Sequence, residues 1–158
     1  KTFGEGHREV GLARHGLAVV LEALGRYSEA EPLLASTAEI RNDVFGPDHP
    51  ESLFAQMNLV VFQARYGLRD GAIDDIDKVI ARMTEIIGPE HQYTAMARMY
   101  RAEVLLFRDV PGADRVVEEE LDFAEGILGA SNPELAIVRD SIAAIRAERE
   151  QQQDAASE

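Results

Sequence analysis

A short motif rich in glycine and proline recurs along the chain at a nearly constant spacing. Its glycines, Gly4, Gly46, Gly88 and Gly129, are separated by 42, 42 and 41 residues. A constant period of this length is typical of stacked structural repeats, in which each unit buries its apolar face against its neighbours. Because such arrays present an extended surface, the period favours a binding function over a catalytic one.

Two amphipathic segments, joined by a short turn, separate successive glycine motifs. Apolar residues at spacings of three and four mark one face of each segment and predict helices. The predicted helices cover residues 8–24, 29–44, 50–66, 71–86, 92–107, 113–127 and 133–150. They make three hairpins (8–46, 50–88 and 91–129) and a capping helix (133–150) within one domain, 1–150, before a polar tail at 151–158. The predicted fold class is all-α, a right-handed α-α superhelix.

Equivalent positions of the repeats hold similar residues. Small residues recur in the first helices at Ala18, Val60, Ala102 and Ala143, and in the second helices at Ala30, Ala72 and Ala113. Small side chains let two helix backbones approach closely, so these positions are predicted to lie between packed helices.

Several helix starts carry recognisable signals. Ser28 with Glu31 predicts a capping box, because a hydroxyl and a carboxylate can each satisfy a free backbone N–H. Asp70 is the predicted N-cap of the next second helix, with Asp74 and Asp75 near the positive end of its dipole.

Composition excludes several functional classes. The net charge of −13 repels a phosphate backbone, so we expect no nucleic-acid partner. The absence of cysteine excludes disulfides and thiolate metal sites and is typical of the cytoplasm. No apolar run approaches the length of about 20 residues that spans a bilayer, so no membrane partner is expected. Since the chain begins at Lys1, we expect it to be part of a longer protein.

The repeat resembles the tetratricopeptide repeat, in the 42-residue form seen in kinesin light chains. The residues that carry the resemblance are Leu17-Ala18, the run from Gly25 to Leu34, Ile40-Arg41 and the run from Phe45 to Pro50. The stretch 24–53 is similar to repeats of bacterial proteins, which often adjoin a Ser/Thr kinase or a nucleotide-binding switch domain. The resemblance covers about residues 3–150. In the third repeat Arg108 is assigned to the position of the turn glycines Gly25 and Gly67.

Histidines in three copies of the glycine motif raise the possibility of a metal site. His7, His49 and His91 belong to different repeats, so stacking separates neighbours by about 8–10 Å. One ion needs its nitrogen ligands at about 2 Å, which excludes a shared metal. The fourth copy has Asn132 before Pro133, a favoured cap and first helical position. The pattern therefore predicts helix caps and no metal or other cofactor.

Other polar clusters have structural interpretations. Asp70, Asp74, Asp75 and Asp77 lack the alternating spacing of a calcium loop and suit a solvated helix start. The run 118–120 of three glutamates is typical of an exposed face, although Glu120 stands at a position that is usually small and allows a partner contact. No cysteine nucleophile or Gly-x-Ser-x-Gly elbow occurs, so the chain is not expected to be an enzyme.

The resemblance implies a concave groove lined by the first helix of each repeat. Helical spacing then directs a set of mixed polar and apolar side chains into it, together with Leu12. The set is His15, Val19, Glu22, Phe54, Met57, Asn58, Val61, Arg65, Met96, Met99, Tyr100 and Glu103. Asn58 matches the family asparagine that pairs with a bound peptide backbone, while its equivalents are Gly16, Tyr100 and Ser141. This apolar, Met-rich lining suits an amphipathic helix or apolar peptide.

Alternatives remain open for several of these residues. Leu12, Phe54 and Met96 can equally pack between repeats. The column of Arg14, Gln56, Arg98 and Arg139 either hydrogen-bonds to turns or recognises an acidic partner. The predicted function is a protein- or peptide-binding module, and the alternative is homo-oligomerisation or packing on an adjoining domain.

Overall fold

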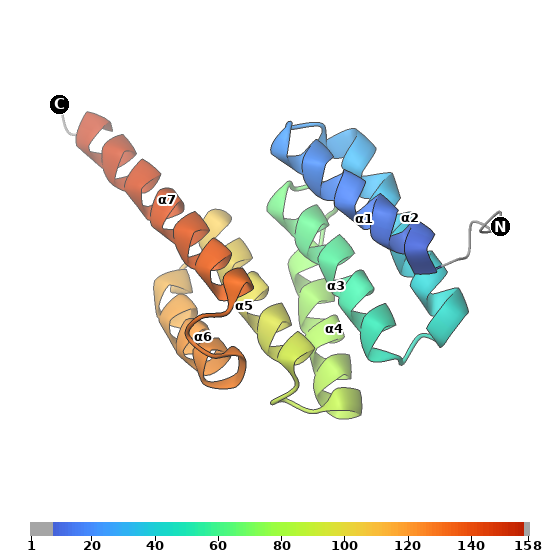
Figure 1. Cartoon of the computed structure of the whole chain (residues 1–158). Helices are drawn as coiled ribbons and strands as arrows, with labels where there is room; N and C mark the ends of the chain where they lie inside the picture. Colours follow the sequence, from blue (N-terminus) through green and yellow to red (C-terminus); the bar gives the residue numbers. More distant parts are fainter. Residues whose placement is uncertain (1–7, 157–158) are drawn as a thin grey trace. The chain divides into compact units, whose positions relative to one another are not determined.

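The computed structural model describes residues 8–156, and within that range every regular element is an α-helix. Figure 1 shows their order along the chain: α1 (Arg8–Ala23), α2 (Tyr27–Phe45), α3 (Pro50–Arg65), α4 (Ala72–Ile87), α5 (Gln92–Phe107), α6 (Ala113–Leu128) and α7 (Pro133–Ala156). The predicted all-α fold of three hairpins and a further helix is confirmed. Gly4 and His7, in the first copy of the glycine motif, lie outside the described residues.

Helix α7 is longer than the sequence predicts. It continues to Ala156, past the end expected near residue 150, so most of the predicted polar tail is helical. Arg149 holds this extension by an ion pair of 2.9 Å to Asp109 and by donating a hydrogen bond to the backbone carbonyl of Leu106. Gln and Ala are good helix formers, which lets the helix continue beyond this anchor.

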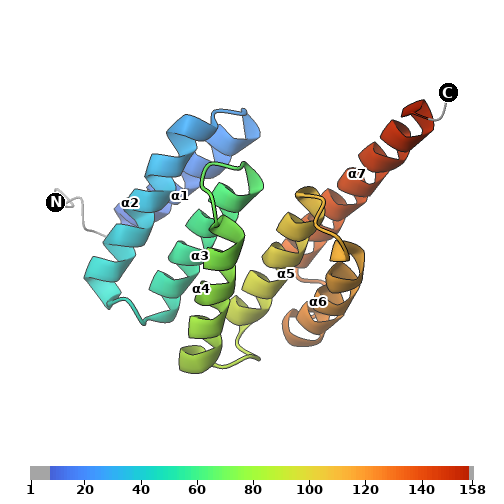
Figure 2. The same cartoon turned by 180° about the vertical axis from the view of Figure 1, so that it is seen from behind.

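The contacts divide the chain into two compact units, Lys1–Gly88 and Pro89–Glu158. In the first unit α1 packs on α2, α2 on α3 and α3 on α4, as both ribbon views show (Figures 1 and 2). In the second unit α7 packs on both α5 and α6, which also pack on each other. The first unit therefore contains two complete helical hairpins. The second contains one hairpin, α5 with α6, and the additional helix α7.

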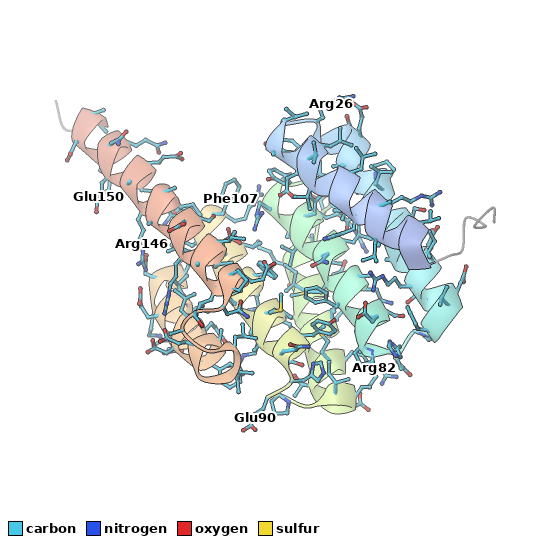
Figure 3. The ribbon with its side chains drawn as sticks, in the orientation of Figure 1. Arg26, Arg82, Glu90, Phe107, Arg146 and Glu150 are labelled. Atoms are coloured by element: carbon cyan, nitrogen blue, oxygen red, sulfur yellow. The ribbon has the colours of Figure 1, made fainter. Side chains whose placement is uncertain are left out.

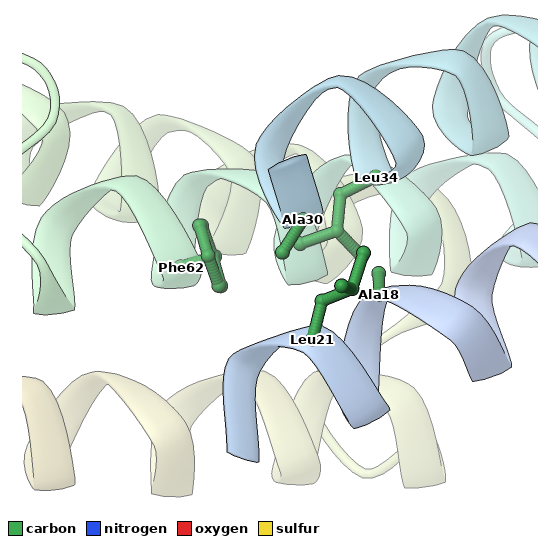
Figure 4. Close-up of a cluster of buried hydrophobic side chains, with 5 residues drawn as sticks. All are labelled: Ala18, Leu21, Ala30, Leu34 and Phe62. Atoms are coloured by element: carbon green, nitrogen blue, oxygen red, sulfur yellow. The ribbon is translucent and has the colours of Figure 1, made fainter. Parts of the chain in front are cut away.

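The core of the first unit includes a cluster from three consecutive helices. Ala18 and Leu21 of α1 meet Ala30 and Leu34 of α2 and Phe62 of α3 (Figure 4). Tyr27 extends the cluster at one end: its ring stacks on Tyr66 at 3.9 Å and meets the edge of Phe62 at 6.2 Å. The hydrophobic effect and these aromatic contacts together fix α3 against the preceding hairpin.

The small residues of both helix types lie where the repeat predicts. Five alanines and one valine at these positions are buried: Ala18, Ala30, Val60, Ala72, Ala102 and Ala113. Ala143 of α7 is exposed instead. In the first helix of a hairpin, this position faces the second helix of the same hairpin. Because the described part of the chain has no helix after α7, no such helix covers Ala143.

The glycine motif ends each second helix by a backbone turn that requires glycine. Gly46, Gly88 and Gly129 have φ of 86°, 90° and 84° with ψ of 157°, 157° and 147°. This region of backbone space is essentially restricted to glycine. The motif therefore stops one helix and redirects the chain into the next. Arg82 of α4, which Figure 3 labels, secures the turn after Gly46. It does so through a 3.0 Å ion pair to Asp48.

Two predicted helix caps are wrong. Helix α2 begins at Tyr27, so Ser28 lies inside the helix, and its N-cap Arg26 makes an ion pair with Glu29 at 2.7 Å in place of a capping box. Helix α4 has Gly71 as its N-cap, in the left-handed conformation with φ of 75°, and Asp70 precedes it. Glycine reaches this conformation without strain, so the turn places it at the cap rather than the aspartate.

The turn of the third hairpin keeps the geometry of the earlier turns without their glycine. Asp109 has φ of 56° where Gly25 and Gly67 have 71° and 63°. Its N–H donates to the carbonyl of Leu106, which matches the bond from Gly25 to Glu22. Asp109, rather than the predicted Arg108, therefore occupies the glycine position. Aspartate tolerates this conformation better than most residues.

Candidate functional site

The described first helices contain all the residues predicted to line the groove, but four of them are buried. Met57 and Met99 are fully buried, and Val61 and Glu103 are nearly so. A buried side chain cannot contact a bound peptide unless the helices move apart. The prediction that these four residues line a binding groove is therefore wrong.

The remaining predicted residues have at least part of their surface in solvent. Val19 and Leu12 are exposed on α1. Six more are half-buried: His15, Glu22, Phe54, Asn58, Met96 and Tyr100. Arg65 is also half-buried. The exposed residues of α1 and α3 belong to the first compact unit and those of α5 to the second, so they form two candidate surfaces.

The structure brings together two predicted residues from consecutive repeats of the first unit. Arg65 of α3 forms an ion pair with Glu22 of α1 at 3.1 Å. The hydroxyl of Tyr66 donates a hydrogen bond of 2.8 Å to the same carboxylate. Burial of the phenol, and then its hydrogen bond to Glu22, raises the pKa of Tyr66 well above its usual value. This cluster joins α1 to α3.

A second pair of polar contacts joins α5 to α7. The hydroxyl of Tyr100 donates to Glu134 at 2.6 Å, and the hydroxyl of Ser141 donates to Glu103. The predicted asparagine-equivalents Tyr100 and Ser141 thus serve contacts within the second unit. Among the equivalent positions, Asn58 alone offers an amide, which can both donate to and accept from an extended peptide backbone.

The column of Arg14, Gln56, Arg98 and Arg139 contacts neighbouring second helices rather than turns. Arg14 donates to Ser36, Gln56 donates to Asn42 at 3.2 Å, and Arg139 donates to Glu125. Arg98 pairs with Glu120 at 2.7 Å and lies over the ring of Phe123 at 3.8 Å. The column is therefore structural.

The glutamate run 118–120 is held by three separate arginines. Glu118 pairs with Arg146 of α7 at 2.8 Å, and Glu119 pairs with Arg115 at 3.5 Å. Glu120 is half-buried against Arg98. The unusual residue Glu120 thus has an internal partner that explains it.

The motif histidines of the described repeats cap helices. The Nδ1 atom of His49 accepts a hydrogen bond from the N–H of Glu51, and that of His91 accepts one from Tyr93, at 3.2 and 3.1 Å. Asn132 accepts from the N–H groups of both Glu134 and Leu135. The predicted capping role is confirmed for these three residues. Within residues 8–156, no group of three or more His, Asp or Glu side chains is placed to bind a metal ion.

The aspartate cluster at the start of α4 makes ordinary surface ion pairs. Asp75 meets Lys78 at 2.8 Å and Arg69 at 3.0 Å. The hydrogen bond from Lys78 is the main cause of a lowered pKa at Asp75. Asp74 and Asp75 lie in the first turn, where the helix dipole favours negative charge, as predicted.

The structure adds a hollow that the sequence does not predict. It has a volume of about 540 Å³ and lies between the end of α5 and the extension of α7. Its lining includes Phe107, Asp109, Ile145, Arg149, Gln152 and Gln153. Figure 3 shows Phe107 at the end of α5. The hollow depends on the continuation of α7, so a prediction that ends this helix near residue 150 misses it.

Comparison with family models gives a match over the first hairpin and the start of α3. Residues 10–51 match the tetratricopeptide-repeat family. Tetratricopeptide repeats generally mediate protein–protein interaction as non-catalytic scaffold modules. No curated protein matches the chain. Among the described residues, no helix is both long and apolar enough to cross a membrane.

Proposed function

We propose that the chain is a non-catalytic module that binds a protein or peptide on the exposed sides of its first helices. The tetratricopeptide-repeat match is the observation that carries this proposal. The first unit supports it with a mixed surface, in which Val19 supplies apolar area and Asn58 supplies an amide. The net charge of −13 favours a protein partner over nucleic acid.

Further features of the proposal concern the parent protein. The resemblance to bacterial repeats and the lack of cysteine support a module of a larger cytoplasmic, bacterial protein. Homo-oligomerisation, or packing on an adjoining kinase or nucleotide-binding domain, is the second candidate. The exposed apolar side chains of α1 favour it, since large exposed apolar patches often mark interaction surfaces.

A peptide-display selection on the purified chain tests the first candidate. We expect selected peptides to bind the wild type, and Asn58→Ala to weaken the binding by about tenfold, as for the loss of one or two hydrogen bonds. Gln151→Ala is the matched control, because this amide is exposed on the C-terminal extension of α7, past every residue predicted to line the groove. Equal affinity for Asn58→Ala and the wild type would show that the surface is assigned wrongly.

Sedimentation across a concentration series tests the second candidate. A chain that stays monomeric at every concentration would exclude homo-oligomerisation. Any catalytic turnover by the purified chain would contradict both candidates.

A further inference from the structure

The hollow beside α7 exists because this helix continues where the earlier first helices turn. The turn residues Gly25, Gly67 and Asp109 all have positive φ. The equivalent residue of α7, 41 positions after Asp109, is Glu150. Glu150 is helical, and α7 runs on to Ala156. The extension therefore passes beside the end of α5 and supplies most of the lining of the hollow.

One face of α7 and the end of α5 line the hollow together. The α7 residues Ile145, Arg149, Gln152 and Ala156 are four, three and four positions apart, which is the spacing of one helical face. Phe107 of α5 adds an aromatic ring that is 45% exposed, and Figure 3 shows it beside α7. Ligand pockets typically combine apolar walls with a few polar groups in a volume of about 300–1,000 Å³. The hollow has both properties.

The charges in the lining decide which ligand the hollow can take. Arg149 is already engaged, because it pairs with Asp109 at 2.9 Å and donates to the backbone carbonyl of Leu106. Glu148 is exposed and makes no hydrogen bond or ion pair with another described residue. An anion would meet two carboxylates here, whereas a cation can pair with Glu148. The lining therefore favours a ligand that carries a positive charge beside an apolar group.

We propose that the hollow binds a short peptide segment in which a large apolar side chain is followed by a lysine. The apolar side chain lies on Phe107 and Ile145 and buries the exposed part of the ring. The lysine ammonium pairs with Glu148, and the exposed amide of Gln152 can donate to and accept from the peptide backbone. Asn58 belongs to α3, so this site and the surface around Asn58 can each fail while the other stands.

A titration followed by nuclear magnetic resonance of the isotope-labelled chain tests the site, with the capped tetrapeptide Gly-Phe-Lys-Gly as the probe. We expect saturable shifts of the backbone amides of Phe107, Asp109, Glu148 and Gln152, with a Kd below about 1 mM. Phe107→Ala should raise Kd by about tenfold, because the probe loses its apolar contact. Circular dichroism of this variant should show an unchanged fold, since Phe107 is exposed at the end of α5.

The charge requirement is tested by exchanging the two partners. Glu148→Lys should raise the Kd of Gly-Phe-Lys-Gly by at least about threefold and lower that of Gly-Phe-Glu-Gly by a similar factor. Glu150→Lys is the matched control, because Glu150 is exposed on the same helix and does not line the hollow. At about 0.15 M salt, which screens separated charges, it should leave both Kd values unchanged. Asn58→Ala should leave them unchanged as well.

Four results would overturn the proposal. The first is a Kd above about 1 mM for Gly-Phe-Lys-Gly. The second is an equal change of Kd in Glu148→Lys and Glu150→Lys, which would mean that overall charge and not the hollow attracts the probe. The third is equal affinity of the wild type for the lysine and the glutamate peptide. The fourth is a set of shifts confined to α1 and α3, which would assign the peptide to the surface around Asn58.

Discussion

The pair Phe62 and Val20 allows one repeat position to be tested in two environments. The two residues are 42 apart in the sequence and occupy the same position of α3 and α1, but their exposed fractions are 3% and 55%. Replacing Phe62 by Ala removes a ring that contacts Leu34, Tyr27 and Tyr66 in the core. Because large-to-small substitution of a buried aromatic costs about 3–5 kcal/mol, Phe62→Ala should strongly destabilise the first unit.

Val20→Ala should change the free energy of unfolding by no more than about 0.5 kcal/mol, as for other exposed sites. Urea unfolding followed by circular dichroism measures the stability of both variants. If the free energy of unfolding falls by about 2 kcal/mol per M urea, the urea midpoint of Phe62→Ala should fall by about 2 M. Hydrogen exchange should show faster exchange in α1–α3. Similar losses for the two variants would refute the reasoning, because they would mean that a helix also covers α1 in the isolated chain.

Three further predictions follow from particular contacts. Gly46→Ala should lower the free energy of unfolding in urea by about 1–3 kcal/mol, because alanine is strained in the backbone conformation of Gly46. Gly16→Ala, which has open space around it within α1, should raise this free energy by about 1 kcal/mol. The reverse order would contradict the assignment of the motif. The raised pKa of Tyr66 favours the protonated phenol in the folded state, so its contribution to stability is complete below about pH 10 and is lost as pH rises further. In Tyr66→Phe the urea midpoint should therefore fall less steeply above about pH 10. An unchanged dependence of the midpoint on pH would contradict this role of Tyr66. Arg98→Ala should lower the free energy of unfolding by about 1–3 kcal/mol, because Glu120 is left half-buried without this partner. Arg115→Ala removes an exposed ion pair and should lower it by about 0.5 kcal/mol or less. Equal losses would show that the column containing Arg98 is not structural.

The period and the apolar spacing were sufficient to predict the helices, because stacking forces each repeat to bury equivalent positions. The caps at Asn132, His49 and His91 were also predictable, since each is a local interaction of one side chain with its own helix start. Ser28 is misleading because the helix begins two residues earlier than predicted, at Tyr27, where the N-cap Arg26 makes an ion pair with Glu29. The end of α7 depends on Arg149 reaching the turn at Asp109, a contact between distant residues that no local pattern reveals.

The surface was harder to predict than the helices. Met57 and Met99 have the helical phase of groove residues, yet they are fully buried. Phase gives the direction of a side chain from its own helix, but burial depends on the helices that pack around it. The same limit applies to α1, where Val20 stands at the repeat position of Phe62 and only the packing makes Phe62 buried and Val20 exposed.

Hydrogen exchange of the chain with and without a display-selected peptide tests the binding account most directly. Slower exchange in α1 and α3 on addition of the peptide is the result that the account predicts, because these helices carry Val19 and Asn58 of the proposed surface. Saturating peptide that leaves exchange in α1 and α3 unchanged, or that protects only the hollow beside α7, would contradict it.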